Sequence, residues 1–148
     1  MLDEELRVLL LCYADEETSE PRWIPPGGAI EPGETHEQAA RRELAEEIGL
    51  DDARVSPCNW TRDIVWEWQG VTYRSREQWF VTRVPRAFEV EPPGLVGDEV
   101  IADWQWWSLS ELTAARASDV DIRPRRLAEL VKSLLEEGPP ATPIDIGL

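Results

Sequence analysis

Residues 28–50 constrain this chain more than any other stretch, because a glycine loop there runs directly into a strongly acidic helix pattern. The helical part carries Glu43, Glu46 and Glu47 at relative positions 0, 3 and 4. On a helix that turns about 100° per residue, the three carboxylates fall within an arc of roughly 100°. Like charges on one helix face repel, so they do not serve helix stability. The pattern predicts either a site for a divalent cation or an ordinary solvated acidic face.

The same segment carries signals for the two ends of the helix. Thr35 with Gln38 three residues later forms a capping box, and Gly49 stands where helices commonly end in glycine. The apolar stripe at i, i+4 and i+8 consists of Ala40, Leu44 and Ile48. Because this stripe lies beside the acidic face, we expect the carboxylates at the edge of the core, partly withdrawn from water.

The charge of the chain limits its partners. The 148 residues carry a formal net charge of −15, whereas binding to a nucleic-acid backbone needs clustered lysine and arginine. We therefore expect a small-molecule partner and no nucleic-acid polymer, with a local cation that offsets repulsion if the molecule carries phosphate. A chain of this length fits one domain with a single core, residues 1–148.

The compartment is predicted from patterns that the sequence lacks. No apolar run reaches the roughly 18 residues of a membrane span, and no signal-peptide pattern starts the chain. Cys12 and Cys58 stand alone in the sequence, which is typical of free thiols in a reducing compartment. We therefore expect a cytoplasmic protein without membrane contact.

Strand and helix patterns alternate along the chain. Residues 7–13 form a continuous apolar run, typical of a strand buried on both faces. Residues 60–68 and 72–84 predict a hairpin around a glutamine–glycine turn, and because both faces are apolar we expect it to be covered on both sides. A further strand is predicted at residues 103–107. The fold class is therefore α/β (α+β), with a mixed β-sheet between helices.

Two helices are predicted in the second half of the chain. Ser108 with Glu111 indicates a short capped helix, and a longer helix follows Pro124 and stops at Gly138. Residues 139–148 are expected to form an extended surface tail.

The acidic helix and its glycine loop suit a hard metal ion. Mg²⁺ prefers oxygen ligands in octahedral geometry, and the three glutamates supply part of such a set. Gly27 and Gly28 let the backbone approach closely, so a carbonyl there could add a ligand. Arg42, four residues before Glu46, could pair with a neighbouring acid and hold it in place. Without metal, the crowding should raise the pKa of at least one carboxylate.

At every defined position, residues 28–50 resemble the Nudix box, Gly-x5-Glu-x7-Arg-Glu-U-x-Glu-Glu-x-Gly-U, where U is a bulky aliphatic residue. The preceding Trp23-x-x-Pro-Gly-Gly28 also looks like the lead-in of that family. The resemblance implies the αβα sandwich of Nudix hydrolases. It also implies hydrolysis of a nucleoside diphosphate linked to another moiety, through attack of water on phosphorus, with Mg²⁺ or Mn²⁺ as cofactor.

The resemblance implies roles for single residues. The three glutamates look like the metal ligands, with Glu43 as first choice for a general base. The Gly28 carbonyl is similar to a common backbone ligand of the family. Glu34, with Gly27, looks like the support of the loop and helix, and Arg42 looks like the residue that orients the carboxylates.

Some family members use a base outside the box. Glu99, in the loop that ends Gly97-Asp98-Glu99, is the first candidate, and Glu77 on the hairpin is the second. Each could instead be an ordinary exposed acid. Trp66 and Trp68 could stack on a substrate base, although their alternation fits core packing as well.

Two other functions fit the same fold. A non-catalytic binding or regulatory module would be expected to have lost box carboxylates, and none is lost here. Isopentenyl diphosphate isomerase chemistry uses a cysteine and a glutamate, but neither cysteine comes with a supporting motif. The family also usually has a strand ahead of residues 7–13, where this sequence has only residues 1–6, and a homodimer is left open.

Overall fold

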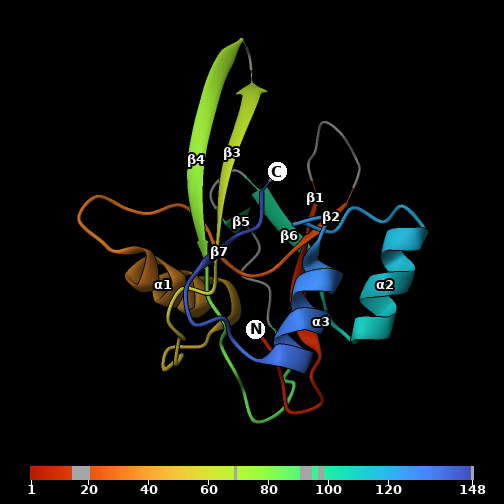
Figure 1. Ribbon diagram of the computed structural model, residues 1–148. Helices are drawn as coiled ribbons and strands as arrows, with labels where there is room; N and C mark the ends of the chain where they lie inside the picture. Colours follow the sequence, from red (N-terminus) through yellow and green to blue (C-terminus); the bar gives the residue numbers. More distant parts are fainter. Residues whose placement is uncertain (15–20, 69, 91–94, 97–98, 148) are drawn as a thin grey trace.

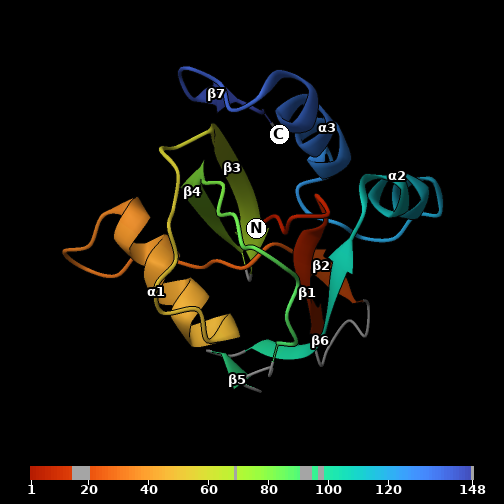
Figure 2. The same cartoon turned by 90° about the horizontal axis from the view of Figure 1, so that it is seen from below.

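The computed structural model describes residues 1–14, 21–68, 70–90, 95–96 and 99–147, with the backbone alone at residues 14, 66, 68, 95–96, 99 and 100. Within these residues the strands form two sheets between helices. α1 (His36–Ile48) lies on one side of the strands, and α2 (Leu109–Ala117) and α3 (Leu127–Glu137) lie on the other, as Figure 2 shows. The structure therefore confirms the predicted αβα arrangement.

The first sheet is antiparallel throughout and has the strand order β2-β1-β6-β5. Its members are β1 (Val8–Ala14), β2 (Arg22–Ile24), β5 (Leu95–Val96) and β6 (Glu99–Trp107). The predicted strands at residues 7–13 and 103–107 correspond to β1 and to the second half of β6. Glu99, which was predicted to lie in a loop, is the first residue of β6, because its backbone pairs with Val96.

The second sheet has the order β4-β3-β7 and is the mixed one. β3 (Trp60–Trp68) and β4 (Val71–Trp79) form the predicted hairpin, and β7 (Ile144–Asp145) pairs parallel to β3. The predicted mixed sheet is thus divided into an antiparallel sheet and a mixed sheet.

The second hairpin arm ends at Trp79 and not at residue 84 as predicted. The backbone N–H of Val81 donates to the side chains of Ser56 (2.9 Å to Oγ) and Asn59 (3.1 Å to Oδ1). These side chains take the place of the β3 backbone as hydrogen-bond partners, so the ladder between the two arms stops.

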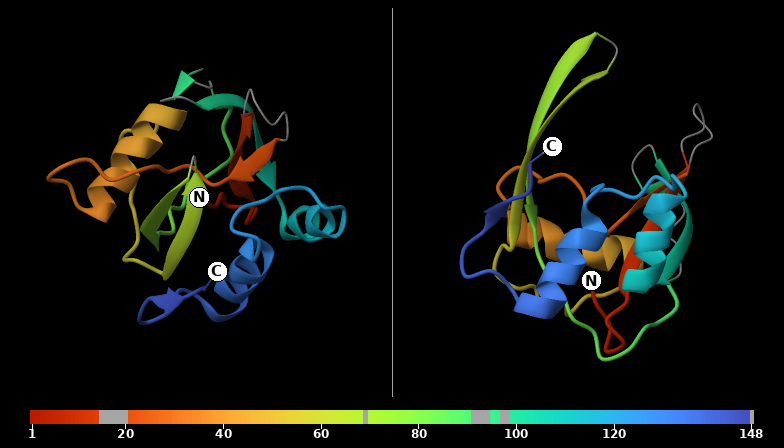
Figure 3. Two further views of the ribbon diagram at one scale, coloured as in Figure 1. Left: turned by 90° about the horizontal axis from the view of Figure 1, so that it is seen from above. Right: turned by 45° about the vertical axis from the view of Figure 1, so that its right-hand side comes forward.

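The outer half of the hairpin is not covered on both sides, which corrects the prediction. Val65 is 53% exposed and Val71 is 51% exposed, and the hairpin extends away from the body of the protein in Figures 1 and 3. The reason is length. The base of the hairpin packs on the core, where Trp60 contacts the cluster that contains α3 residues, and the nine residues of each strand span about 30 Å and carry the outer half beyond it.

The core lies on both faces of β1, as the apolar run predicted. Leu9 and Leu11 pack with Leu44 and other α1 residues in one buried cluster. Val8 and Leu10 belong to a second cluster, which contains residues of α2 and α3 such as Leu112, Leu127 and Val131. The strand therefore fixes the position of α1 relative to the two other helices.

Both ends of the described chain are attached to the sheets. Leu2 is buried and makes isolated bridges with Val8 and Arg83, so residues before β1 do contribute to pairing. The predicted surface tail instead supplies β7, and Ile146 behind it is only 5% exposed. No helix in the described part of the chain is both long and apolar enough to cross a membrane.

Candidate metal centre

Both predicted ends of α1 are confirmed by their hydrogen bonds. The Thr35 hydroxyl accepts from the N–H of Gln38 (3.3 Å), and the Gln38 side chain accepts from the N–H of Thr35 (2.8 Å). Gly49 follows the last turn at φ 69°, and its N–H donates to the carbonyl of Ala45 (3.0 Å). The left-handed backbone at this position is the conformation that glycine adopts without strain.

The buried face of α1 includes two of the three acids. It is formed by Ala39, Glu43, Leu44, Glu47 and Ile48, with Ala39 in place of the predicted Ala40. Glu43 is 6% exposed and Glu47 is 2% exposed, whereas the Glu46 side chain is 53% exposed. Two carboxylates are therefore withdrawn from water further than the helix pattern indicated.

Glu47 is held by groups from two other segments. The hydroxyl of Tyr13 on β1 donates to its Oε1, and the backbone N–H of Gly27 donates to its Oε2 at 2.8 Å. Each carboxylate oxygen thus has one donor, and each keeps a further lone pair for another partner. The two bonds join the glycine loop, β1 and α1 at a single carboxylate.

The pKa of Glu47 is raised to about 7, mainly by burial and also by the charges of Glu43 and Glu46, against the lowering effect of the bonds from Tyr13 and Gly27. A raised carboxylate pKa was expected from the crowding of like charges. The larger cause is desolvation, because the side chain is enclosed between α1 and β1. A cation at this place would favour the ionised form.

Glu43 lies directly against the backbone of Gly28. A Cβ atom at position 28 would overlap the Glu43 carboxylate, with Cδ at 2.7 Å and Oε2 at 2.9 Å. Gly28 therefore leaves the Glu43 carboxylate the position it occupies against the loop, and a larger residue would displace that carboxylate. This approach brings the main chain of the glycine loop to the carboxylate, which is the combination that a backbone-plus-carboxylate metal site needs.

Arg42 binds three acids and one carbonyl. Its Nη1 donates to Glu43 and to Glu46, each at 2.9 Å. Its Nη2 donates to Glu34 at 2.8 Å and to the carbonyl of Ala29 at 2.9 Å. The guanidinium group thus offsets part of the negative charge on α1 and connects the helix to the preceding loop.

Glu34 completes this connection. Its Oε1 accepts from Arg42 and from the backbone N–H of Glu31 at 2.7 Å. The bond from Arg42 is the main cause that holds the Glu34 pKa below its ordinary value. The side chain is therefore ionised at neutral pH and fixes the loop relative to the helix.

Among the described side chains, the structure does not bring the candidate base and substrate-binding residues outside the box together with the box glutamates. Glu77 has other partners, and the remaining candidates have side chains that the structure does not describe. Glu77 accepts two bonds from Arg62, each at 2.9 Å, and one from the Trp79 indole at 3.0 Å. Among the contacts of the described residues, none joins Glu77 to the three box glutamates. The side chains of Glu99, Trp66 and Trp68 are not among those described, so their roles stay predictions.

The oxygen atoms of the box glutamates are suitable ligands for a divalent cation, although these side chains bind other protein groups in the structure. In the described part of the chain, no three Asp, Glu, His or Cys side chains already converge as a metal-holding group. Glu43 and Glu46 face the Arg42 guanidinium, which supplies positive charge in place of a metal. Oxygen ligands, the close Gly28 backbone and a buried carboxylate with a raised pKa all fit Mg²⁺ or Mn²⁺.

Tyr13 is a site residue that the sequence did not identify. It ends the aliphatic run of β1, on the face that carries Leu9 and Leu11 toward α1. A buried tyrosine hydroxyl usually has a hydrogen-bond partner, so a single tyrosine in such a strand was a usable signal. The partner of this hydroxyl depends on how α1 packs on β1, so the sequence did not predict that it is Glu47.

Comparison with known proteins gives one family match over most of the chain. The family model of the NUDIX domain matches residues 1–130. A curated RNA pyrophosphohydrolase from Tolumonas auensis is 38% identical over 97 residues, which cover 58% of this chain and 56% of that protein. One from Yersinia enterocolitica is 39% identical over 72 residues, 42% of this chain and 41% of that protein. The chain thus aligns with about half the length of these relatives.

Solved structures give the same fold at lower identity. A dihydroneopterin triphosphate pyrophosphohydrolase from E. coli superposes with a TM-score of 0.60 at 23% identity, covering 86% of this chain and 84% of that one. An Ap4A hydrolase from C. elegans superposes with a TM-score of 0.57 at 21% identity, covering 87% and 83%. At these identities the likeness is one of fold.

Proposed function

Because this chain belongs to the Nudix hydrolase family, we propose that it hydrolyses a diphosphate linkage in a nucleoside diphosphate-X substrate with the help of Mg²⁺ or Mn²⁺. The observation that carries the proposal is the buried Glu47 carboxylate, which meets the glycine loop through Gly27 and has a pKa raised to about 7. A fold gains nothing from a buried, crowded acid unless a cation or proton compensates its charge.

Glu43, Glu46 and Glu47 would hold the metal, together with the carbonyl of Gly28. When bound, the ion would neutralise charge on the phosphate oxygens and lower the pKa of an attacking water. Glu46, the exposed member of the three, is free to turn from Arg42 toward the ion at small cost, because its bond to Arg42 is largely in solvent. Arg42 and Glu34 keep the loop and helix in register while this happens.

Glu43 is the proposed general base. Both oxygens of Glu47 already accept bonds from Tyr13 and Gly27, so its carboxylate is fixed in orientation. Glu43 accepts one bond, from Arg42, and lies at the loop backbone. It is therefore the better placed of the two buried acids to take a proton from water. Glu99 and Glu77 stay the alternatives.

A nucleotide-type small molecule is the proposed substrate class. The net charge of −15 disfavours extended contact with a nucleic-acid backbone. The curated relatives are named RNA pyrophosphohydrolases, so the 5′-triphosphate end of an RNA also belongs among the substrates to be tested. We further propose that residues 1–148 act as one domain, since β7 near the end of the chain pairs with β3.

A substrate panel tests the proposal. The protein with Mg²⁺ is incubated with nucleoside triphosphates, nucleotide sugars, a diadenosine polyphosphate and a 5′-triphosphate oligonucleotide, and release of phosphate or pyrophosphate is measured. We expect turnover of at least one compound and its loss on chelation. Absence of turnover with all of them, while the metal still binds, would favour the alternative of a non-catalytic ligand-binding or regulatory module.

Glu46→Gln is the sharpest variant for the metal site. Because Glu46 is half-exposed, its substitution should leave folding unchanged and lower activity by orders of magnitude. Glu37→Gln is the matched control, since Glu37 is an exposed acid on the same helix and pairs with Arg41. Equal activity in the two variants would contradict the ligand role of Glu46.

A further inference from the structure

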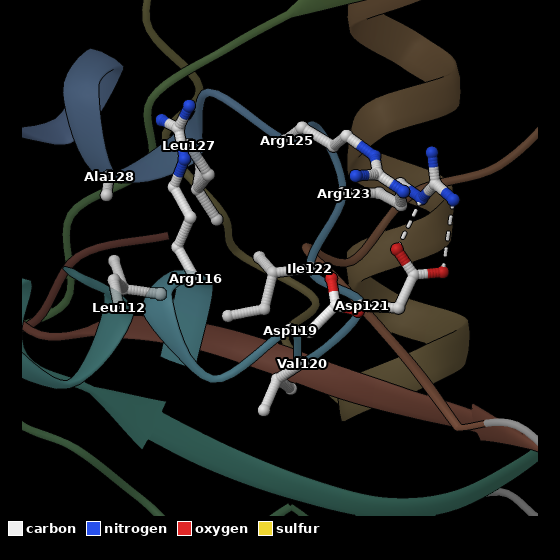
Figure 4. A pocket seen from close by; sticks show the side chains of 10 residues that line it. All are labelled: Leu112, Arg116, Asp119, Val120, Asp121, Ile122, Arg123, Arg125, Leu127 and Ala128. Atoms are coloured by element: carbon white, nitrogen blue, oxygen red, sulfur yellow. Dashed lines mark hydrogen bonds and ion pairs between the residues drawn. The ribbon is translucent and has the colours of Figure 1, made fainter. Parts of the chain in front are cut away.

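Arginines gather around two adjoining hollows on the side of the strands that carries α2 and α3. The larger has a volume of about 270 Å³ and lies between the end of α2 and the start of α3. In Figure 4, Arg116 stands on one side of it and Arg123 and Arg125 on the other. Leu112, Ile122 and Leu127 supply apolar lining.

The smaller hollow, of about 90 Å³, is more strongly charged. Its lining contains four arginines and no acidic residue, and it consists of Arg62, Arg123, Pro124, Arg125, Arg126, Ile146 and Gly147. The whole chain has 30 acidic and 15 basic residues. Four arginines around one small space are therefore unusual in so acidic a chain, and their positive charges favour an anion there.

Neighbouring acids hold most of these guanidinium groups in place. Arg62 pairs with Glu77, Arg126 pairs with Glu129 at 3.0 Å, and Arg123 pairs with Asp121 at 2.7 Å. A guanidinium group has five N–H donors, so each pair leaves donors for another acceptor. Arg125 is exposed and makes no ion pair with any residue in the described part of the chain.

The hollows are connected to the candidate metal centre through the backbone. Trp23 on β2 donates its N–H to the carbonyl of Asp121 (2.8 Å) and accepts from the N–H of Arg123 (2.9 Å). Gly27, which binds Glu47, follows four residues later, and four extended residues span at most about 14 Å. The arginine segment is thus fixed to the strand that leads into the glycine loop.

We propose that the smaller hollow is a binding site for a phosphate group, held by Arg123, Arg125 and Arg126 with Arg62. The larger hollow beside it, which shares Arg123 and Arg125, gives room for the rest of a phosphorylated ligand. Planar guanidinium groups bind phosphate oxygens in pairs, which explains arginine at these positions. The site is separate from the box carboxylates and binds phosphate without a metal.

Binding is tested on metal-free protein in low salt, with inorganic phosphate and pyrophosphate as probes in calorimetric titrations. Without metal the acidic box repels both anions, so the signal reports the arginine site. We expect Arg125→Gln to weaken binding about three- to tenfold, and Arg123→Gln with Arg125→Gln to weaken it further. Arg54→Gln is the matched control, since Arg54 is an exposed arginine that lines neither hollow.

The proposal is overturned if the wild-type protein binds neither probe, or if Arg125→Gln and the double variant bind as tightly as Arg54→Gln. Turnover with Mg²⁺ then tells the source of the phosphate. A raised KM with unchanged kcat in Arg125→Gln assigns the site to a remote phosphate of the substrate. Unchanged KM and kcat, with phosphate binding lost, assign it to a separate phosphorylated ligand. The titrations measure binding without turnover. Their result therefore still holds if the proposed hydrolysis is not found.

Discussion

The hydroxyl of Tyr13 on β1 donates a hydrogen bond to the carboxylate of Glu47 on α1, 34 residues further along the chain. The bond runs between the buried face of the antiparallel sheet and the helix that carries the acids. It lowers the Glu47 pKa, whereas burial raises it to a net value of about 7. The strand thereby sets how readily the helix presents an ionised carboxylate near neutral pH.

Tyr13→Phe should shift the pH dependence of metal binding upward. The change removes a donor to the ionised carboxylate, so the pKa of Glu47 should rise further, by about one unit at most. A metal ion binds the ionised form, and its affinity should therefore reach half-maximum at a higher pH. Titration of the metal at several pH values between about 6 and 9 measures the shift. Tyr73→Phe, on the hairpin, should leave the midpoint where it is.

Glu47 should contribute a loss of stability to the metal-free protein as pH rises toward neutrality. The pKa of Glu47 is about 7 in the folded state against an ordinary 4.5, so between these values the folded state holds more protons than the unfolded state. The stabilising contribution of the protonated group is complete below the lower value and is lost by the upper one. The loss in free energy of unfolding is of the order of 3 kcal/mol.

Urea denaturation of wild type and Glu47→Gln measures this loss. The difference in free energy of unfolding between the two proteins should grow from about pH 5 and level off above about pH 7 to 8. Mg²⁺ should stabilise the wild type alone and thereby make this difference smaller. Parallel stability curves would show that Glu47 does not titrate in this range.

Arg42→Lys should lower activity at least about tenfold although the charge is kept. A lysine has one ammonium group and cannot bind Glu34, Glu43 and Glu46 at once as the guanidinium does. Steady-state turnover measures the effect. The neighbouring Arg41→Lys is the control, because Arg41 makes only an exposed pair with Glu37 at 2.6 Å among the described residues. Comparable losses in both variants would argue against an orienting role of Arg42.

Gly28→Ala should lower activity through displacement of Glu43. The added methyl group would overlap the Glu43 carboxylate, and a shift of about 1 Å in a catalytic group can cost about a hundredfold in rate. In a Glu43→Gln background, the same substitution should have little further effect. Equal losses in both backgrounds would show that Gly28 acts independently of Glu43.

Local patterns predicted the elements that depend on neighbouring residues in the sequence. The capping boxes at Thr35 and Ser108 and the stop at Gly49 are confirmed, because a cap needs partners only three or four residues away. The pair of Arg42 with Glu46 follows from helix spacing in the same way, whereas its bonds to Glu34 and to the carbonyl of Ala29 depend on the fold of the preceding loop.

Features that depend on packing between distant segments were missed. The pairing of Tyr13 with Glu47 needs the position of α1 on β1, and the arginine hollow joins β3, the start of α3 and the chain near residue 146. The prediction of a covered hairpin was wrong because alternation reports which face is apolar, not whether a neighbour is long enough to reach it. The expected cytoplasmic location and the homodimer stay predictions.

The protruding hairpin has a consequence for the behaviour of concentrated protein. In the described part of the chain, β7 pairs only with Trp60 and Thr61 at the start of β3, so the outer backbone of both arms forms sheet edges that another chain could extend. Asp63 with Arg76, and Arg74 opposite Val65, place charges on these arms. A strand added at this edge would place its side chains beside these charges, and we therefore expect the ribbon to resist aggregation through its own edge.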